Sequence, residues 1–289
     1  MSIKPRFYAL AVFSLGVFLS ANVSADIVIS DNFDGTAGVG PALQLVTNGV
    51  GVGIDGGGGG SFNNGTGVVQ AGGDTNGSTS ASGFNNAALV TVPSDVVAIK
   101  ANFEIDSVEN LLFTRSNGFF VGLVTGTGAT ATNGSGLFNN NATNGIGLLF
   151  NSDNETDTAL DETRVVSDGA SDGVPVTQTG LAAADFPAPA DVEDGFTFSI
   201  TLNSDDTIDV LTTGLTTDIN ATGVALSAGV VFEDFVDNGV GVSASFQGGG
   251  GGFTAGSVSV HLETEAIPEP SSLALLGLTT LGLVARRRR

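Results

Sequence analysis

Residues 196–202 alternate strictly between apolar and polar side chains. A period of two sends successive side chains to opposite faces of a strand, so this pattern predicts a half-buried β-strand. The turn-forming residues 203–206 lead into a second alternating run, and the two runs together predict an antiparallel hairpin. Comparable short runs, separated by Gly, Asn and Asp, recur along the chain, and they predict strands at 27–30, 88–92, 97–105, 118–125, 145–151, 164–167, 196–203, 207–212, 225–232, 239–246 and 257–263. No long amphipathic helical pattern accompanies them, and this spacing favours an all-β fold, a two-sheet antiparallel sandwich, over a barrel.

Charge and residue types exclude several classes of function. The 289 residues hold 30 acids and 9 bases, and such an acidic chain repels nucleic acids. The absence of Cys excludes disulfides, thiolate nucleophiles and Cys-ligated zinc. His261 is the only histidine, so no site can use two imidazoles, and we interpret it as a surface residue of the last predicted strand.

The first 25 residues have the pattern of a secretory signal peptide. Lys4 and Arg6 precede an apolar run at 7–19, and small residues follow up to Ala25. This order predicts a signal helix, Sec-dependent export and signal peptidase cleavage between Ala25 and Asp26. The alternative, a permanent transmembrane anchor, needs about 20 apolar residues.

Three features stand in a fixed order at the other end of the chain. Pro268, Glu269 and Pro270 are followed by an apolar segment at 273–285 and then by Arg286, Arg287, Arg288 and Arg289. The prolines hold the backbone around Glu269 extended, a shape that suits a protease cleft. A 13-residue helix spans roughly 20 Å, less than the ~30 Å hydrocarbon core, so the segment predicts a short membrane helix. The four arginines favour the cytoplasmic side for the chain terminus.

The segment 267–289 resembles the PEP-CTERM sorting signal of Gram-negative bacteria, which combines a Pro-Glu-Pro motif, a short apolar helix and a basic cluster. The resemblance implies an exosortase as partner and transient anchoring in the inner membrane. It also implies a final place at the cell surface or in the extracellular matrix, and an association with exopolysaccharide and biofilm. The alternative is a simple tail anchor.

Between the two signals, residues 26–266 form the predicted ectodomain. The body keeps Lys100, Arg115 and Arg164 as its bases and nearly all of the acids, and Phe is its only aromatic residue type. It resembles the concanavalin A-like jelly roll of lectins, laminin-G modules and some glucanases. The residues that carry the resemblance are 31–35, 118–123, 196–211 and 256–258.

Glu104, Asp106 and Glu109 are the best catalytic candidates. On a strand, Glu104 and Asp106 share a face, and one extra residue in a β-bulge returns Glu109 to it. The spacing resembles the Glu-x-Asp-x-x-Glu motif of laminarinase-type glycosidases, which implies Glu104 as nucleophile and Glu109 as acid/base. However, Ser107 stands where that family has a large aliphatic residue, and the body lacks Trp and Tyr for sugar stacking. We therefore interpret the protein as a non-enzyme and keep glycoside hydrolysis as the alternative.

Acids between positions 153 and 162 form a second cluster. Asp153, Glu155, Asp157 and Asp161 supply the oxygen ligands that Ca²⁺ prefers, but no EF-hand glycine accompanies them, and we favour a solvated loop over a Ca²⁺ site here. The glycine runs at 56–60 and 248–252 predict flexible loops and lack the Lys of a phosphate loop. Taken together, the sequence predicts an exported non-enzymatic surface or matrix protein, with weak Ca²⁺-assisted binding of extracellular polysaccharide as an additional hypothesis.

Overall fold

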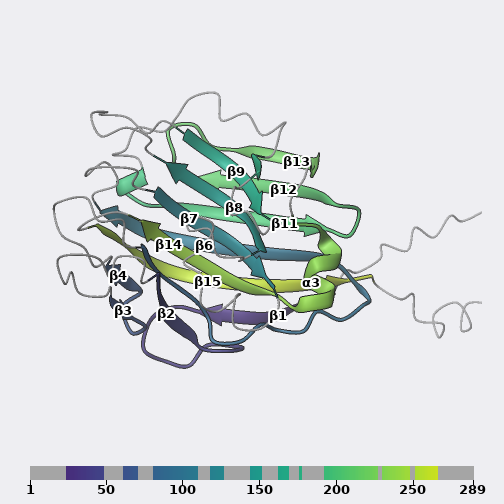
Figure 1. Ribbon diagram of the computed structural model, residues 1–289, viewed down its shortest axis with the longest axis horizontal. Helices are drawn as coiled ribbons and strands as arrows, with labels where there is room; N and C mark the ends of the chain where they lie inside the picture. Colours follow the sequence, from purple (N-terminus) through teal and green to yellow (C-terminus); the bar gives the residue numbers. More distant parts are fainter. Residues whose placement is uncertain are drawn as a thin grey trace, which may run out of the picture. The chain divides into compact units, whose positions relative to one another are not determined.

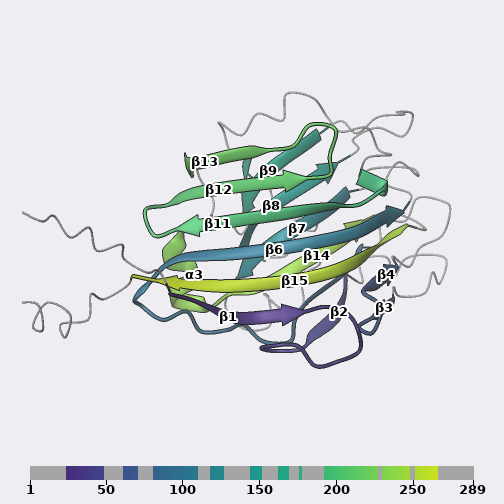
Figure 2. The same cartoon turned by 180° about the vertical axis from the view of Figure 1, so that it is seen from behind.

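The computed structural model of the chain describes residues 24–48, 61–70, 81–109, 118–126, 144–151, 162–168, 176–177, 192–226, 230–247 and 251–265. Within them, two antiparallel sheets face each other, which confirms the predicted all-β sandwich (Figures 1 and 2). Residues 24–264 form one compact unit. The signal helix and the membrane helix that the sequence predicts lie outside the described residues.

The eight-stranded sheet is built around two long neighbouring strands, β6 (Val96–Glu109) and β15 (Gly252–Thr264). β15 pairs with β6 on one side and with β1 (Ser24–Asp31) and β4 on the other. The order along the sheet is β13 (Asn220–Ala225), β12 (Thr207–Thr213), β11 (Phe196–Asn203), β6, β15, β4 (Val68–Gln70) and β3 (Ser61–Asn63), with β1 as the eighth strand beside β15, as Figure 2 shows.

The seven-stranded sheet has β7 (Gly118–Thr125) near its centre, flanked by β8 and β14. Its order is β10 (Val176–Thr177), β9 (Glu162–Asp168), β8 (Asn144–Asn151), β7, β14 (Gly241–Gln247), β5 (Ala81–Asn86) and β2 (Leu43–Asn48). Chain neighbours such as β6 and β7, or β14 and β15, belong to opposite sheets. The two sheets are therefore interleaved along the sequence, and neither folds from one continuous segment.

The predicted hairpin is confirmed as β11 and β12. Phe198 lies opposite Thr212 and Ile200 opposite Val210, and all four side chains are buried. In the turn, the backbone N–H of Thr207 donates to Asp205 Oδ1 at 3.2 Å. The alternation in the sequence therefore corresponds to one face in the core and one face in solvent.

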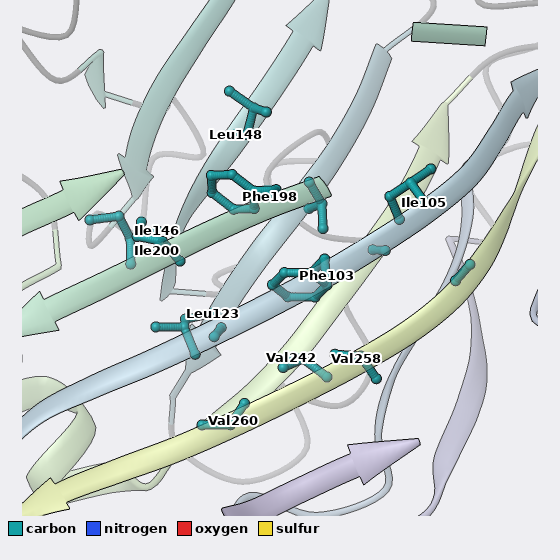
Figure 3. Packing of buried hydrophobic residues seen from close by; sticks show 14 of the residues in the cluster. Phe103, Ile105, Leu123, Ile146, Leu148, Phe198, Ile200, Val242, Val258 and Val260 are labelled. Carbon is teal, nitrogen blue, oxygen red and sulfur yellow. The ribbon is translucent and has the colours of Figure 1, made fainter. Parts of the chain in front are cut away.

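The core fills the space between the sheets. Phe103 and Ile105 of β6 belong to one buried cluster with Leu123 of β7 and Val242 of β14 (Figure 3). Aromatic packing is carried by Phe alone, for example the pair Phe119 and Phe253, whose ring centroids lie 5.0 Å apart. Because each fully buried Phe contributes about 1.5–3 kcal/mol by leaving water, these rings hold the two sheets together.

Residues 88–92, predicted as a strand, form only a single bridge between Val90 and Val240. The side chain of Asn86 explains the departure from the sheet, because its Nδ2 donates to the Pro41 carbonyl at 3.0 Å and its Oδ1 accepts from Val242 N at 2.8 Å. Pro93 follows and has no N–H to continue a ladder. The prediction of a strand here was wrong.

The prediction of a strand at 225–232 was also wrong. β13 ends at Ala225, and Phe232 begins a short helix, α3 (Phe232–Asn238). Two carboxylates satisfy N–H groups at its start: Asp206 Oδ1 accepts from Phe232 N at 3.0 Å, and Asp234 Oδ2 accepts from Val231 N at 2.8 Å. Phe232 and Phe235, three residues apart, are both buried, which is helical spacing.

Several strands were not predicted, because they are short or contain very few apolar residues. β5 contains Phe84 as its only large apolar residue, and β3 and β4 have three residues each. β5 nevertheless lies between β14 and β2, so its conformation comes from pairing on both sides and not from local pattern.

Candidate functional site

Glu104, Asp106 and Glu109 lie along the outer face of β6. All three are exposed, whereas Ile105 and Val108 point into the core. The register passes from Ser107 opposite Thr254 to Ile105 opposite Ala255, which leaves Asp106 without a paired residue on β15. This is the extra residue that the sequence hypothesis required, and it is why one face carries all three carboxylates.

The irregularity at Asp106 depends on close approaches by two glycines. A Cβ on Gly256 would lie 2.4 Å from Asp106 Oδ1, and Gly195, at a φ of 91°, would place a Cβ 2.4 Å from the Asp106 carbonyl oxygen. At Gly195 the contact is with backbone atoms, so no larger residue fits there, whereas at Gly256 it is with the exposed Asp106 side chain, which a larger residue would displace. Partial burial, and then the neighbouring charge of Glu104, raise the pKa of Asp106 above its usual 3.8. Glu104 is held from the other side by Ser257, whose Oγ donates to Glu104 Oε2 at 3.0 Å.

The surroundings of these carboxylates supply little else for catalysis. Within the described residues, no three His, Cys, Asp or Glu side chains gather closely enough to hold a metal ion. The large apolar side chains exposed in the described ranges are Ile27, Val39, Leu45 and Leu211, so no aromatic ring there offers a platform for a sugar. Glu104 and Asp106 can accept hydrogen bonds, and the charge of one disfavours the charged form of the other.

A row of side-chain hydrogen bonds crosses the same outer face, one strand after another. Ser199 Oγ on β11 donates to Asn102 Oδ1 on β6 at 3.0 Å, and Asn102 Nδ2 donates to Ser259 Oγ on β15 at 3.2 Å. Ser259 Oγ lies 3.1 Å from His261 Nε2. We call Ser199, Asn102, Ser259 and His261 the polar row. All four side chains are half-buried.

The hydrogen bonds of the polar row run in one direction, from Ser199 to Asn102 and from Asn102 to Ser259. Asn102 Nδ2 already donates to Ser259 Oγ, so the Ser259 hydroxyl hydrogen is available for His261 Nε2 in the tautomer that carries its proton on Nδ1. His261 lies opposite Lys100 of β6. Sequence reasoning placed His261 on the strand but missed its partners. Small polar residues at alternate positions of three strands were the available signal.

Many acids of the body hold turns and are not free ligands. Asp31 Oδ1 accepts from Phe33 N at 2.7 Å, and Asp209 Oδ1 accepts from Gly223 N at 2.7 Å. Asp34 accepts from both the side chain and the backbone N–H of Thr36, which lowers the pKa of Asp34 below its usual 3.8. The calcium candidates Asp153, Glu155, Asp157 and Asp161 lie outside the described residues.

The first and the last described strands of the body, β1 and β15, are neighbours in the sheet. Ser24 at the start of β1 lies opposite Thr264 at the end of β15, and Ala25 lies opposite Glu263. The bond between Ala25 and Asp26, where the sequence predicts cleavage, is therefore inside β1. The described part of the chain contains no helix long and apolar enough to cross a membrane. Pro268, Glu269, Pro270, the segment 273–285 and the four arginines lie beyond it.

Residues 266–289 match the PEP-CTERM protein-sorting motif. This confirms the family resemblance of the chain's end, and we call residues 266–289 the sorting motif from here on. A PEP-CTERM motif implies an exported protein that an exosortase recognises. The sorting motif begins two residues after β15 ends, so the folded body leads almost directly into it. No curated protein is similar to the chain in sequence.

Solved structures similar to the chain include several lectins. A lectin from Bauhinia forficata in complex with GalNAc is 12% identical over 85% of this chain and 100% of the lectin, with a TM-score of 0.47. The exoplasmic/lumenal domain of VIP36 bound to Ca²⁺ and Man3GlcNAc is 11% identical over 78% of this chain and 86% of that domain, with a TM-score of 0.43. Arcelin-5, a lectin-like defence protein of Phaseolus vulgaris, is 13% identical over 85% and 100%, with a TM-score of 0.43. At these values, none of the similarities identifies what this chain binds.

Proposed function

We propose that the protein is exported through the Sec machinery, freed from its signal peptide and delivered by an exosortase to the cell surface or extracellular matrix. There its acidic β-sandwich acts as a non-enzymatic component associated with exopolysaccharide or biofilm. The observation that carries the proposal is the sorting motif at 266–289, which follows directly on the last strand of a separately folded body. A strongly acidic surface suits such a location, because like charges keep exported copies apart in solution.

The proposal is tested by an epitope tag placed after Arg289. In a Gram-negative host with an active exosortase, we expect the tag to be lost from the mature protein and the body to appear outside the inner membrane. Replacing Pro268 and Pro270 by Ala removes the constraint that holds the motif extended, and we expect the tagged form to accumulate.

A matched control is available elsewhere in the sequence. Pro187 and Pro189 form a second Pro-x-Pro pattern, and their replacement by Ala should leave sorting unchanged. Tag loss that persists in the Pro268 and Pro270 variant would contradict sorting through this motif. Equal accumulation in both variants would indicate a general folding defect.

Glycan binding by the body is a second part of the proposal, and the polar row supports it. Ser199, Asn102 and Ser259 present hydroxyl and amide groups on a sheet face that is not closed off from solvent. Such groups match the hydroxyls of a polysaccharide. We expect weak binding of residues 26–265 on a glycan array, reduced by Asn102→Ala, and a calorimetric titration with Ca²⁺ tests whether the ion assists. Absence of binding with and without Ca²⁺ would contradict this part.

Glycoside hydrolysis remains the alternative function, favoured by one observation. The irregularity at Asp106 puts Glu104, Asp106 and Glu109 on one face, as a retaining hydrolase requires. Hydrolysis of laminarin by the purified body, abolished by Glu104→Gln and unaffected by Glu263→Gln, would establish it. We expect no hydrolysis, because the described residues around the carboxylates offer no aromatic platform.

A further inference from the structure

The last two residues of β15 have a neighbouring strand on each side. On one side, Glu263 lies opposite Ala98 and Thr264 opposite Val96 of β6. On the other side, the neighbours are Ala25 and Ser24, the first residues of β1. The end of the strand that leads into the sorting motif is therefore covered by the residues that the predicted signal peptidase cut would remove.

Cleavage between Ala25 and Asp26 changes this end of the sheet. It leaves β6 in place but takes away the β1 residues opposite Glu263 and Thr264. Opposed residues of antiparallel strands alternate between hydrogen-bonded and non-hydrogen-bonded pairs, so losing two consecutive partners frees the backbone groups of one of them. Glu263 and Thr264 are only half-buried and Glu265 is exposed, so the freed edge is accessible.

We propose that this edge, the β1 side of Glu263 and Thr264, is a docking strand for the sorting enzyme and is uncovered by removal of the signal peptide. The inference rests on the proposed function, because it requires both cleavage at Ala25 and sorting through residues 266–289. It adds an order to the two events, since the enzyme binds well only after the signal peptide has gone.

The short stretch of chain between Thr264 and Pro268 is the reason for choosing the sorting enzyme as the partner. Three residues separate Thr264 from Pro268. At ~3.3–3.6 Å per extended residue, Pro268 lies within roughly 14 Å of Thr264. An enzyme that binds the Pro-Glu-Pro segment is therefore within reach of the end of β15. Extended peptides commonly bind by strand addition, with backbone hydrogen bonds between peptide and partner.

Charge adds a requirement on the partner. Asp26 and Glu265 are exposed, Glu263 is half-buried beside them, and Glu269 follows within the motif. Basic groups around the binding cleft would complement this acidic edge and guide its approach.

The freed edge is tested by amide hydrogen exchange on two purified bodies, residues 24–265 and 26–265. Both contain the compact unit's whole core and differ only in Ser24 and Ala25. We expect the amide of Glu263 or Thr264 to exchange at least about tenfold faster in the shorter body, while the amide of Ile200 in β11 exchanges equally in both. Equal exchange at Glu263 and Thr264 would overturn the inference.

The docking role is tested in a host with an active exosortase. Full-length chains carry signal peptides whose cleavage leaves Ser24 or Asp26 as the first residue, verified by mass spectrometry, and the rate of loss of a C-terminal tag is followed by pulse-chase. We expect the chain that begins at Ser24 to lose its tag several-fold more slowly. Ala25→Pro in that longer chain should restore the rate, because proline has no N–H for strand pairing.

The outcomes separate the two proposals. Equal rates for the three chains overturn docking on β15 and leave sorting intact. If no chain loses its tag, sorting itself is contradicted, and the docking partner falls with it even where hydrogen exchange shows a free edge.

Discussion

In the eight-stranded sheet, the outer-facing residues of β11 and β6, such as Ser199 and Asn102, are half-buried and hydrogen-bonded to each other. In the seven-stranded sheet, the outer-facing Phe120, Val124 and Leu149 are 0–3% exposed and form a separate apolar cluster. Ser243 and Ser245 on the same face are buried as well. One sheet thus has a single buried face and the other has two.

This difference is visible in the amino-acid sequence. β11 alternates because only its inward residues are buried, whereas residues 118–124 of β7 form an almost continuous apolar run because both faces are covered. Opposite residues Gly122 and Gly147 make room on the buried outer face: a Cβ on either would come within 2.9 Å of the Phe120 ring. Glycine here is a packing requirement and not a sign of a loop.

Phe120→Ala should have the largest effect among the variants that test this comparison. If the outer face of β7 is a packed layer, its loss should lower the free energy of unfolding by about 3–5 kcal/mol, as for other buried Phe residues. The control is Leu211→Ala on the outer face of β12, where the side chain is 45% exposed and we expect a change below about 1 kcal/mol. Urea unfolding of the body measures both, and similar losses would remove the distinction between the two faces.

Asn102→Ala should have an intermediate effect. It removes the central member of the polar row and leaves Ser199 and Ser259 without that partner, at a cost of about 1–2 kcal/mol in unfolding free energy. Thr201→Ala, one pair further along β11, serves as the control and should cost less. Indistinguishable urea midpoints for the two variants would show that the row contributes nothing to stability.

Ser245→Ala should be close to neutral or slightly stabilising. Its Oγ is buried beside Phe120 and has no hydrogen-bond partner in the described structure, so its removal relieves a desolvated polar group. The same change at Ser259, which is bonded to Asn102, should be destabilising. A loss above about 1 kcal/mol for Ser245→Ala would mean that the hydroxyl has a role on this face.

The smallest effect concerns pH. Because the pKa of Asp106 is raised in the folded state, its charged form opposes folding, and this loss of stability appears as the pH rises above the usual value of 3.8. Asp106→Asn should therefore raise the melting temperature slightly at pH 7, and the gain should disappear at a pH below 3.8, where both side chains are neutral. A gain that is independent of pH would point to packing around Gly256 and not to charge.

The pattern of apolar and polar residues predicted those parts of the fold whose side chains divide cleanly between core and solvent. β11, β12 and β7 are examples, and the extra residue at Asp106 follows from the spacing of three carboxylates that all face outward. β5 and β3 could not be predicted, because strand pairing across the sheet determines them and their own sequences hardly do. α3 was missed because its start depends on Asp206, which is distant in sequence and satisfies Phe232 N. The polar row likewise depends on register among three strands.

The place of β15 has a consequence for the timing of folding. Among the described strands it is the last to be synthesised, yet it lies between β6 and β1 and pairs with residues about as distant as the body allows, from Ser24 to Thr264. Contacts between such distant residues are slow to form. If the chain is exported from its N-terminus, as we propose, this sheet cannot be completed until β15 has crossed the membrane, and the body stays open during transit. Closure of the sheet then coincides with the arrival of the sorting motif.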